Sequence, residues 1–151
     1  MDWKQLSSNQ RFFLNVIIPS MYLVPLVGAF LLPKHFGFGF TPLIYFGLAI
    51  GAAGMLLWIG AMFSLGPRLA VLPGASDLVT RGVYRYLRHP LYVGIVLALL
   101  GLFLACGSIF GLAFLVLGVV PLNVARARWE DRALQEQFGE AYATYRRRTW
   151  F

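Results

Sequence analysis

Charged residues are missing from three long stretches of the chain, and these stretches give the first expectation of its structure. No Asp, Glu, Lys or Arg occurs at residues 12–32, 41–65 or 91–124. A helix crosses the hydrocarbon core of a bilayer with about 20 apolar residues. The first two stretches are long enough for one crossing each, and the third is long enough for two. The pattern therefore predicts four membrane-spanning helices.

The third stretch is interrupted at "CGSIFG", where Cys106, Gly107 and Ser108 favour a tight turn. We therefore expect its two halves to form a helical hairpin. The predicted fold is an all-α integral membrane protein with one membrane-embedded domain at residues 1–151. The expected bounds are 12–32, 41–65, 89–105 and 108–130 for the four helices and 131–151 for a short cytoplasmic C-terminal helical segment. The fourth helix is expected to continue as a charged helix that leaves the membrane and ends at Gly139, and residues 140–148 are expected to form a second short helix.

The first two predicted helices have features of their own. Residues 12–32 exceed the usual 7–15-residue core of a signal peptide and have no small-residue cleavage motif, so we expect this segment to be retained. Its prolines Pro19 and Pro25 predict a kinked helix. In the second helix, Thr41 is expected to be the N-cap, and the small residues of "GLAIGAAG" permit close helix packing.

The basic residues predict the orientation in the membrane. The chain has 13 Lys and Arg against 6 Asp and Glu. Arginines gather in the loop 66–89 and in the tail, whereas the first loop has only Lys34 and the hairpin turn has none. By the positive-inside rule, both termini and the loop 66–89 are expected in the cytoplasm. Because these residues flank membrane helices, anionic lipid headgroups are the expected partner and nucleic acid is not.

A metal site or a disulfide is not expected. Cys106 is the single cysteine, and His35 and His89 are the only histidines. No Cys/His spacing typical of zinc ligands is present. We therefore expect no metal, and we interpret Cys106 as a packing residue.

Chemistry is expected from two polar clusters at residues 77–94 and 123–151. They bracket the predicted hairpin, so antiparallel legs would bring them together. Pro90 suits the first turn of a helix and places His89 at the helix entrance, where unpaired N–H groups favour an anionic ligand. Arg126 and Glu130 share one face of a helix. Taken separately, the clusters also fit an aromatic and arginine belt at the headgroups and a solvated helix with a weak surface ion pair.

Taken together, the clusters resemble a known family. "RGVYRYLRHPLYVG", followed about thirty residues later by "R-x-x-x-E-D-x-x-L-x-x-x-F-G-x-x-Y-x-x-Y", is similar to the isoprenylcysteine carboxyl methyltransferase family and to the related membrane phospholipid methyltransferases. The resemblance covers about residues 65–148. It implies an integral membrane enzyme that binds S-adenosylmethionine between its last membrane helices and the C-terminal segment, without a Rossmann domain.

The resemblance also implies roles for particular residues. Arg126 and Glu130 would be catalytic, with Arg126 directed to the acceptor and Glu130 to the cofactor or the transferring methyl group. The implied cofactor-binding residues are His89, Pro90, Leu91, Tyr92, Gly94, Glu130, Tyr142 and Tyr145. Two features depart from the family: the acidic pair is Glu130-Asp131 where Glu-Glu is frequent, and many relatives continue beyond the equivalent of Phe151 with a segment containing Pro and Arg.

The expected function is S-adenosylmethionine-dependent methylation of a lipophilic acceptor, such as the carboxylate of an isoprenylcysteine-like group, at the cytoplasmic face of the membrane. A carboxylate acceptor needs no base at neutral pH, whereas an amine or thiol would need one, and Glu130 or His89 would be the candidates. Two alternatives stay open. One is a membrane sterol or enone reductase that uses NADPH, and the other is a non-catalytic lipid-binding scaffold.

Overall fold

The computed structural model describes residues 22–31, 36, 40–66 and 78–151. This part of the chain is all-helical, with 85% of its residues in helices and no strand. The elements are α3 (Leu23–Leu31), α4 (Thr41–Leu65), the 3₁₀ helix η4 (Gly82–Arg85), α5 (Pro90–Cys106), α6 (Ile109–Phe114), the π-helix η5 (Leu115–Val119), α7 (Val120–Phe138) and α8 (Glu140–Arg148).

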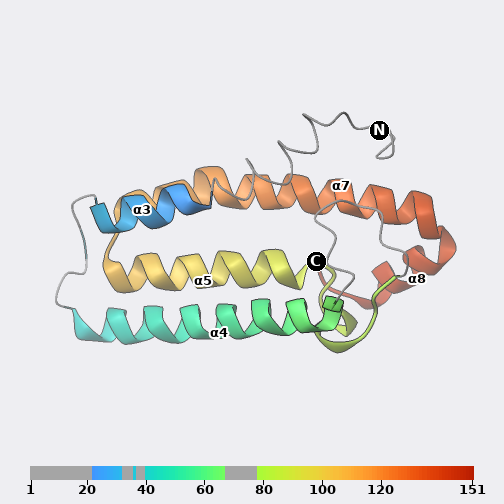
Figure 1. Ribbon diagram of the computed structural model, residues 1–151, viewed down its shortest axis with the longest axis horizontal. Coiled ribbons are helices and arrows are strands. Elements are labelled where there is room, and N and C mark those ends of the chain that lie inside the picture. Colours follow the sequence, from blue (N-terminus) through green and yellow to red (C-terminus); the bar gives the residue numbers. More distant parts are fainter. Residues whose placement is uncertain (1–21, 32–35, 37–39, 67–77) are drawn as a thin grey trace.

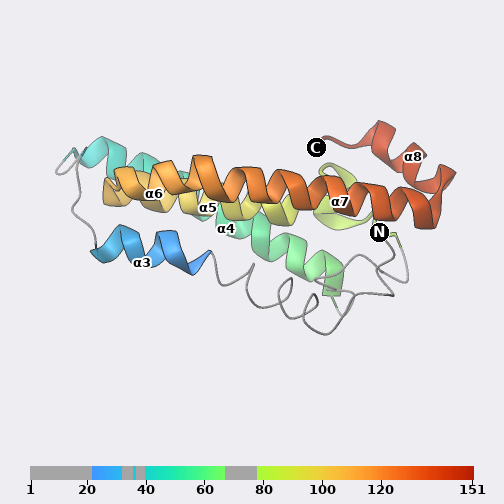
Figure 2. The same cartoon turned by 90° about the horizontal axis from the view of Figure 1, so that it is seen from above.

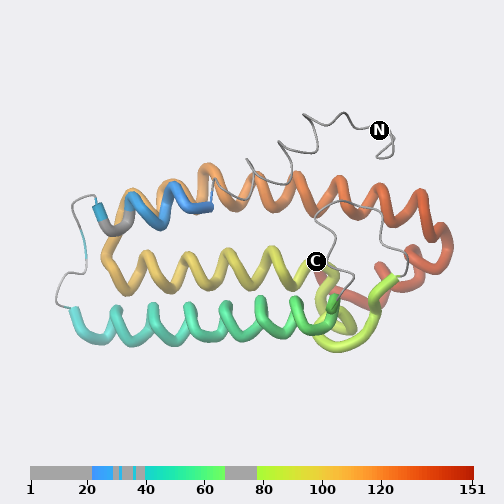
Figure 3. The backbone as a smooth tube through the Cα atoms, viewed as in Figure 1, coloured from blue at the N-terminus to red at the C-terminus, as the bar shows by residue number. Residues whose placement is uncertain are grey.

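The long helices run side by side along the long axis of the molecule, and α5 lies between α4 and α7 (Figure 1). Seen from above, α3 lies beside the helix that begins with α6 (Figure 2). The turn between α5 and α6 is at one end of the bundle, and η4, α8 and the C-terminus are at the other (Figure 3). The two polar clusters therefore meet at one end, as the hairpin predicts.

Glycines allow α4 and α5 to pack closely. A Cβ atom at Gly47 would lie 2.6 Å from the backbone nitrogen of Ala105, and one at Gly94 would lie 2.7 Å from that of Trp58. Real Cβ contacts this short do not occur, so larger residues would push the helices apart. The small residues at Gly47–Gly54 thus serve helix packing, as expected.

The hairpin turn is confirmed. Gly107 ends α5 with φ 65°, in the left-handed region that glycine adopts without strain. Ser108 then caps the next helix, and its side chain accepts a hydrogen bond from the backbone nitrogen of Gly111 at 3.1 Å. The predicted cap of α4 was wrong. Thr41 is already helical and the N-cap is Phe40, which makes no side-chain capping bond.

The charged helix that continues from the fourth membrane helix ends at Gly139, as predicted. α6, η5 and α7 follow one another directly to Phe138, eight residues beyond the expected end of the membrane-spanning part at residue 130. Helix formation does not depend on apolar side chains, and the helix continues through its charged residues until Gly139, whose φ is 52°. The predicted short helix at residues 140–148 is confirmed as α8.

Within the described residues, two helices are long and apolar enough to cross a membrane: α4 and the continuous helix Ile109–Phe138. Only 11% and 22% of their apolar windows are buried, and large side chains such as Leu56, Phe63 and Leu117 are exposed. This exposure suits contact with lipid rather than the core of a soluble domain. Four crossings are not confirmed, since α5 has 17 residues and much of the predicted helix 12–32, including Pro19, lies outside the described residues.

Candidate active site

His89 joins the entrance of α5 to the polar end of α7. Pro90 occupies the first turn of α5 and is fully buried, and His89 is the N-cap, with 4% of its surface exposed. The His89 Nε2 atom lies 2.8 Å from Oδ1 of Asp131, and Nδ1 lies 3.5 Å from Oε2 of Glu130. Both ring nitrogens therefore face carboxylates that α7 supplies.

This environment favours the protonated imidazole. Burial alone would lower the pKa of His89, but the hydrogen bonds and negative charges of Asp131 and Glu130 outweigh it and raise the pKa above its ordinary value. A protonated ring donates from both nitrogens and so satisfies both carboxylates. His89 is consequently suited to holding and orienting the acidic pair, and it is a poor general base.

Asp131 is the centre of the cluster. In addition to His89, its carboxylate accepts a hydrogen bond from the hydroxyl of Tyr142, and its Oδ2 atom lies 3.4 Å from a terminal nitrogen of Arg88. Sequence reasoning noted Asp131 only as a departure from the family pattern and missed this role. The signal available was its position beside Glu130, opposite the basic "RH" pair of the first cluster.

Tyr142 and Tyr145 come from α8, and their rings lie 6.0 Å apart. Tyr142 is 1% exposed, and Tyr145 donates a hydrogen bond to the backbone oxygen of Tyr84 at 2.7 Å. Burial raises the pKa of Tyr145 to about 12, so its hydroxyl stays a neutral donor. Both tyrosines thus fasten α8 to the polar end of the bundle.

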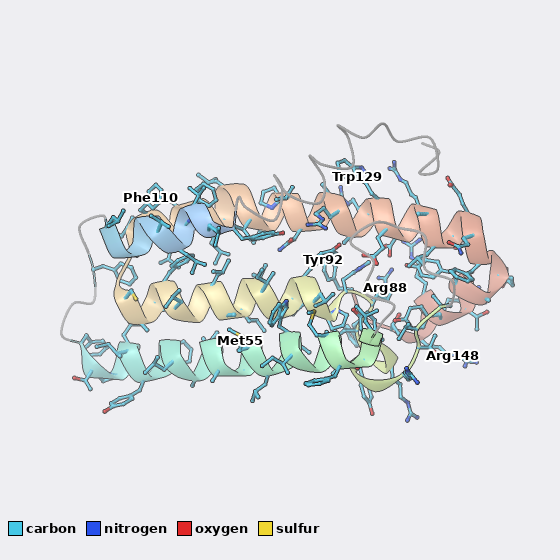
Figure 4. All side chains as sticks on the ribbon, in the orientation of Figure 1. Met55, Arg88, Tyr92, Phe110, Trp129 and Arg148 are labelled. Atoms are coloured by element: carbon cyan, nitrogen blue, oxygen red, sulfur yellow. The ribbon has the colours of Figure 1, made fainter. Side chains whose placement is uncertain are left out.

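Arg126 and Tyr92 form a contact between α7 and α5. The guanidinium carbon of Arg126 lies 5.6 Å from the centre of the Tyr92 ring, and that ring stacks on His89 with centroids 5.7 Å apart. Figure 4 shows Tyr92 between the two helices, whereas Trp129 lies on the outer side of α7. Glu130, whose side chain is 40% exposed, is next to His89. Among the described residues, no ion pair joins Arg126 to Glu130. The weak surface ion pair that the alternative interpretation predicts is therefore not observed in this part of the chain.

Leu91 and Gly94 stand apart from this network. Leu91 is half-buried in the first turn of α5. The place of a Gly94 side chain is taken by the backbone of Trp58, so packing against α4 accounts for this glycine. The contacts of Leu91 and Gly94 with a cofactor stay predictions.

Trp150 and Phe151 pair with the backbone that leads to His89. The backbone nitrogen of Arg88 donates to the carbonyls of Trp150 and Phe151 at 3.0 and 2.9 Å, and that of His89 donates to Phe151 at 3.2 Å. The Phe151 ring also meets the His89 ring edge-on at 5.7 Å. This terminal pair therefore covers one side of His89. Sequence reasoning missed it because main-chain bonds carry most of the contact.

Within the described residues, no group of three or more His, Cys, Asp or Glu side chains is arranged to hold a metal ion. Cys106 is half-buried at the end of α5, beside the hairpin turn.

Comparison with known proteins identifies the family. Residues 43–141 match the phospholipid methyltransferase family. The chain is 44% identical over 74 residues to the cobalt-zinc-cadmium resistance protein CzcN of Cupriavidus metallidurans, covering 49% of this chain and 34% of that protein. It is 34% identical over 71 residues to the protein-S-isoprenylcysteine O-methyltransferase of Schizosaccharomyces pombe, covering 47% of this chain and 30% of that enzyme.

The matched segments thus span about a third of the length of these two relatives, and no solved structure matches. The family match, in contrast, covers well over half of this chain and includes α5, α7 and the His89–Asp131 contact between them. The resemblance drawn from the two polar clusters is confirmed, and the chain belongs to the phospholipid methyltransferase family.

Proposed function

We propose that this membrane protein transfers a methyl group from S-adenosylmethionine to a lipophilic acceptor at the cytoplasmic face of the membrane. The observation that supports the proposal most directly is the cluster in which His89 faces Glu130 and Asp131 while Arg126 covers Tyr92. It lies at one end of the bundle, where the start of α5 meets the membrane-length helix Ile109–Phe138. Family membership supports methyl transfer as the reaction.

The residues present fit this cofactor chemically. S-adenosylmethionine carries hydroxyl and ammonium donors, a carboxylate and a flat aromatic base, and when bound it supplies a methyl group activated by a sulfonium. Glu130 is partly exposed and its carboxylate has acceptor capacity beyond the single contact with His89. Tyr92 offers an aromatic face, and aromatic faces and carboxylates both attract cations. The residues proposed to hold the cofactor are His89, Pro90, Leu91, Tyr92, Gly94, Glu130, Tyr142 and Tyr145.

The side chains contribute positioning and charge. Asp131 orients His89, and His89 in turn orients Glu130 through its Nδ1 atom. Arg126 is proposed to hold an anionic oxygen of the acceptor, because a guanidinium donates several hydrogen bonds and keeps its charge. Since the donor is already activated, alignment and electrostatic matching supply most of the rate enhancement. No side chain needs to remove a proton from a carboxylate acceptor such as that of an isoprenylcysteine-like group.

The site is proposed to face the cytoplasm in a multi-pass protein with four crossings. Arg81, Arg85 and the arginines of α8 gather at the same end of the bundle as His89, and the positive-inside rule assigns that end to the cytoplasm. Reporter fusions after Lys34 and after Arg148 should then report opposite sides of the membrane. Reporters on the same side would contradict this topology.

Cofactor binding provides the first test. Titration calorimetry of purified protein with S-adenosylhomocysteine should give a saturable signal, and NADPH should give none. His89→Ala and Tyr92→Ala should weaken binding on the order of tenfold or more, since each loses contacts at the proposed site. Cys106→Ala, at the other end of α5, is the control and should bind normally. Wild-type affinity in both site variants would contradict the placement, and binding of NADPH alone would favour a reductase.

A further inference from the structure

A second polar group lies on the membrane side of Arg126. Asn123 precedes Arg126 by one turn of α7 and is 3% exposed, within the apolar part of the helix. Its Oδ1 atom accepts a hydrogen bond from the hydroxyl of Tyr22, just before α3. Its Nδ2 atom is buried and has no hydrogen-bond partner among the described residues. Buried amide donors are almost always paired, so this one requires an explanation.

The direction of this hydrogen bond fixes which end of the amide is free. The Tyr22 hydroxyl donates to Oδ1 of Asn123. Because an amide oxygen accepts and an amide nitrogen donates, Nδ2 is left as a buried donor without a partner in the described part of the chain. Tyr22 thereby orients the amide.

The free donor lies on the face of α7 that carries the candidate site. Asn123, Arg126 and Glu130 are three and seven residues apart, which places them on one side of the helix. Asn123 and Glu130 are separated by about 10 Å along the axis at 1.5 Å per residue. The free amide donor of Asn123 and the guanidinium of Arg126 thus lie toward the membrane end of this face, and the carboxylates that contact His89 lie toward the other end.

We propose that Asn123 Nδ2, oriented by Tyr22, is a second hydrogen-bond donor beside Arg126 for an anionic oxygen of the methyl acceptor. The inference rests on the proposed function, and it adds Asn123 as a binding residue and Tyr22 as its positioning residue. A purely structural hydrogen bond between helices would account for the pairing of Oδ1 with Tyr22. It would not account for the buried Nδ2 that has no partner among the described residues. The anionic oxygen can belong to a carboxylate on a lipid chain or to the phosphate of a phospholipid, and both match a guanidinium and an amide donor.

Two matched pairs of probes separate these sources. N-acetyl-S-farnesylcysteine is compared with its carboxamide, and dioleoyl phosphatidic acid is compared with dioleoylglycerol. Affinities are measured by thermophoresis in dodecylmaltoside, without cofactor. The wild-type protein should prefer the anionic member of one pair, and that pair identifies the source of the oxygen. A protein that prefers neither anionic member would overturn the inference.

Variants then test the residues. Asn123→Leu should lower the affinity for the preferred anionic probe about tenfold, because it removes a hydrogen bond to a charged group. Tyr22→Phe should lower the ratio of affinities for the anionic and neutral probes, a change that a purely structural role would not produce. Ser108→Ala removes another buried polar group, at the hairpin end, and should alter neither affinity.

The failures can be told apart. Unchanged probe affinity in Asn123→Leu would overturn this inference, and if that variant does not fold, an unchanged affinity ratio in Tyr22→Phe overturns it instead. All three variants should bind S-adenosylhomocysteine as the wild type does. Absence of S-adenosylhomocysteine binding in the wild type itself would overturn the proposed function.

Discussion

The Nε2 atom of His89 lies 2.8 Å from Oδ1 of Asp131, and this contact connects the first turn of α5 to the polar end of α7. It forms between residues 42 positions apart in the sequence. Arg88 and Tyr142 reach the same carboxylate, so the segment before α5 is connected to α7 and α8 through a single side chain. The stability of this end of the bundle and the geometry of the candidate site therefore depend on the same residue.

Replacement of Asp131 should destabilise the protein. Asp131→Ala would leave His89 and Tyr142, both buried, without their acceptor. We expect a loss of about 2 kcal/mol in the free energy of unfolding, in the range for unsatisfied buried donors. Thermal unfolding in detergent measures the change. The control is Arg147→Ala, which breaks an exposed pair with Glu140 and should cost under about 0.5 kcal/mol. Equal effects of both variants would contradict a structural role for Asp131.

Stability should also depend on pH through His89. Its pKa in the folded protein is raised by Asp131 and Glu130, despite burial. A raised pKa means that folding stabilises the protonated form, so the contribution is fully present below the ordinary value of about 6.5 and is lost as pH rises through the folded-state pKa. The melting temperature of the wild type should therefore fall over that window, whereas that of His89→Gln should change less. A wild-type melting temperature that rises there would contradict the assignment.

Glycine in α5 should be required for packing. In Gly94→Ala the new methyl group would meet the backbone of Trp58, and backbone atoms cannot rotate away. We expect a loss of about 1–3 kcal/mol, as for other overpacked sites. Gly60→Ala is the matched control, because its Cβ would lie 3.5 Å from a methyl group of Val83, an ordinary contact. If Gly94→Ala melts as the wild type does but loses S-adenosylhomocysteine binding, then Gly94 serves the cofactor rather than packing.

Much of the fold could be predicted because the absence of charge is a strong signal. The bounds of α4 agree with the uncharged stretch 41–65, and Gly107 marks the hairpin turn as expected. The end of α7 was predicted from Gly139 rather than from the pattern of charge. Its charged residues continue the helix in water or at headgroups as well as apolar residues do in lipid, so the change of polarity at Arg126 marks no helix boundary.

The candidate site was predictable only where side chains carry a motif. His89, Glu130 and the two tyrosines of α8 lie in recognisable spacings, and the hairpin brings them to one end. The contacts of Trp150 and Phe151 use backbone groups, which every residue has, so no residue type in the sequence indicates these contacts. Asn123 was also missed, because one polar residue in an apolar helix does not reveal that only one end of its amide is paired.

Arg126 and Glu130 allow the sharpest kinetic test. They lie one turn apart on α7, yet Arg126 contacts Tyr92 and Glu130 contacts His89. We expect Arg126→Ala and Glu130→Ala to fold and to lose on the order of 100-fold in rate, about 2.7 kcal/mol of transition-state stabilisation. Initial rates with an anionic lipid acceptor measure this loss. Arg128→Ala, an exposed arginine of the same helix, is the matched control and should keep its activity.

Cofactor affinity separates the roles of these two residues. Glu130→Ala and Glu130→Gln should both weaken S-adenosylhomocysteine binding, because the amide keeps the shape of the side chain but loses the charge that the hydrogen-bond donors of the cofactor would meet. Arg126→Ala should bind S-adenosylhomocysteine normally, since its partner is the acceptor. Arg126→Lys should recover little activity if two parallel hydrogen bonds hold the acceptor, because an ammonium cannot form that fork. A large loss of cofactor affinity in Arg126→Ala would instead move Arg126 to the cofactor side of the site, where its contact with Tyr92 would hold the aromatic face in place.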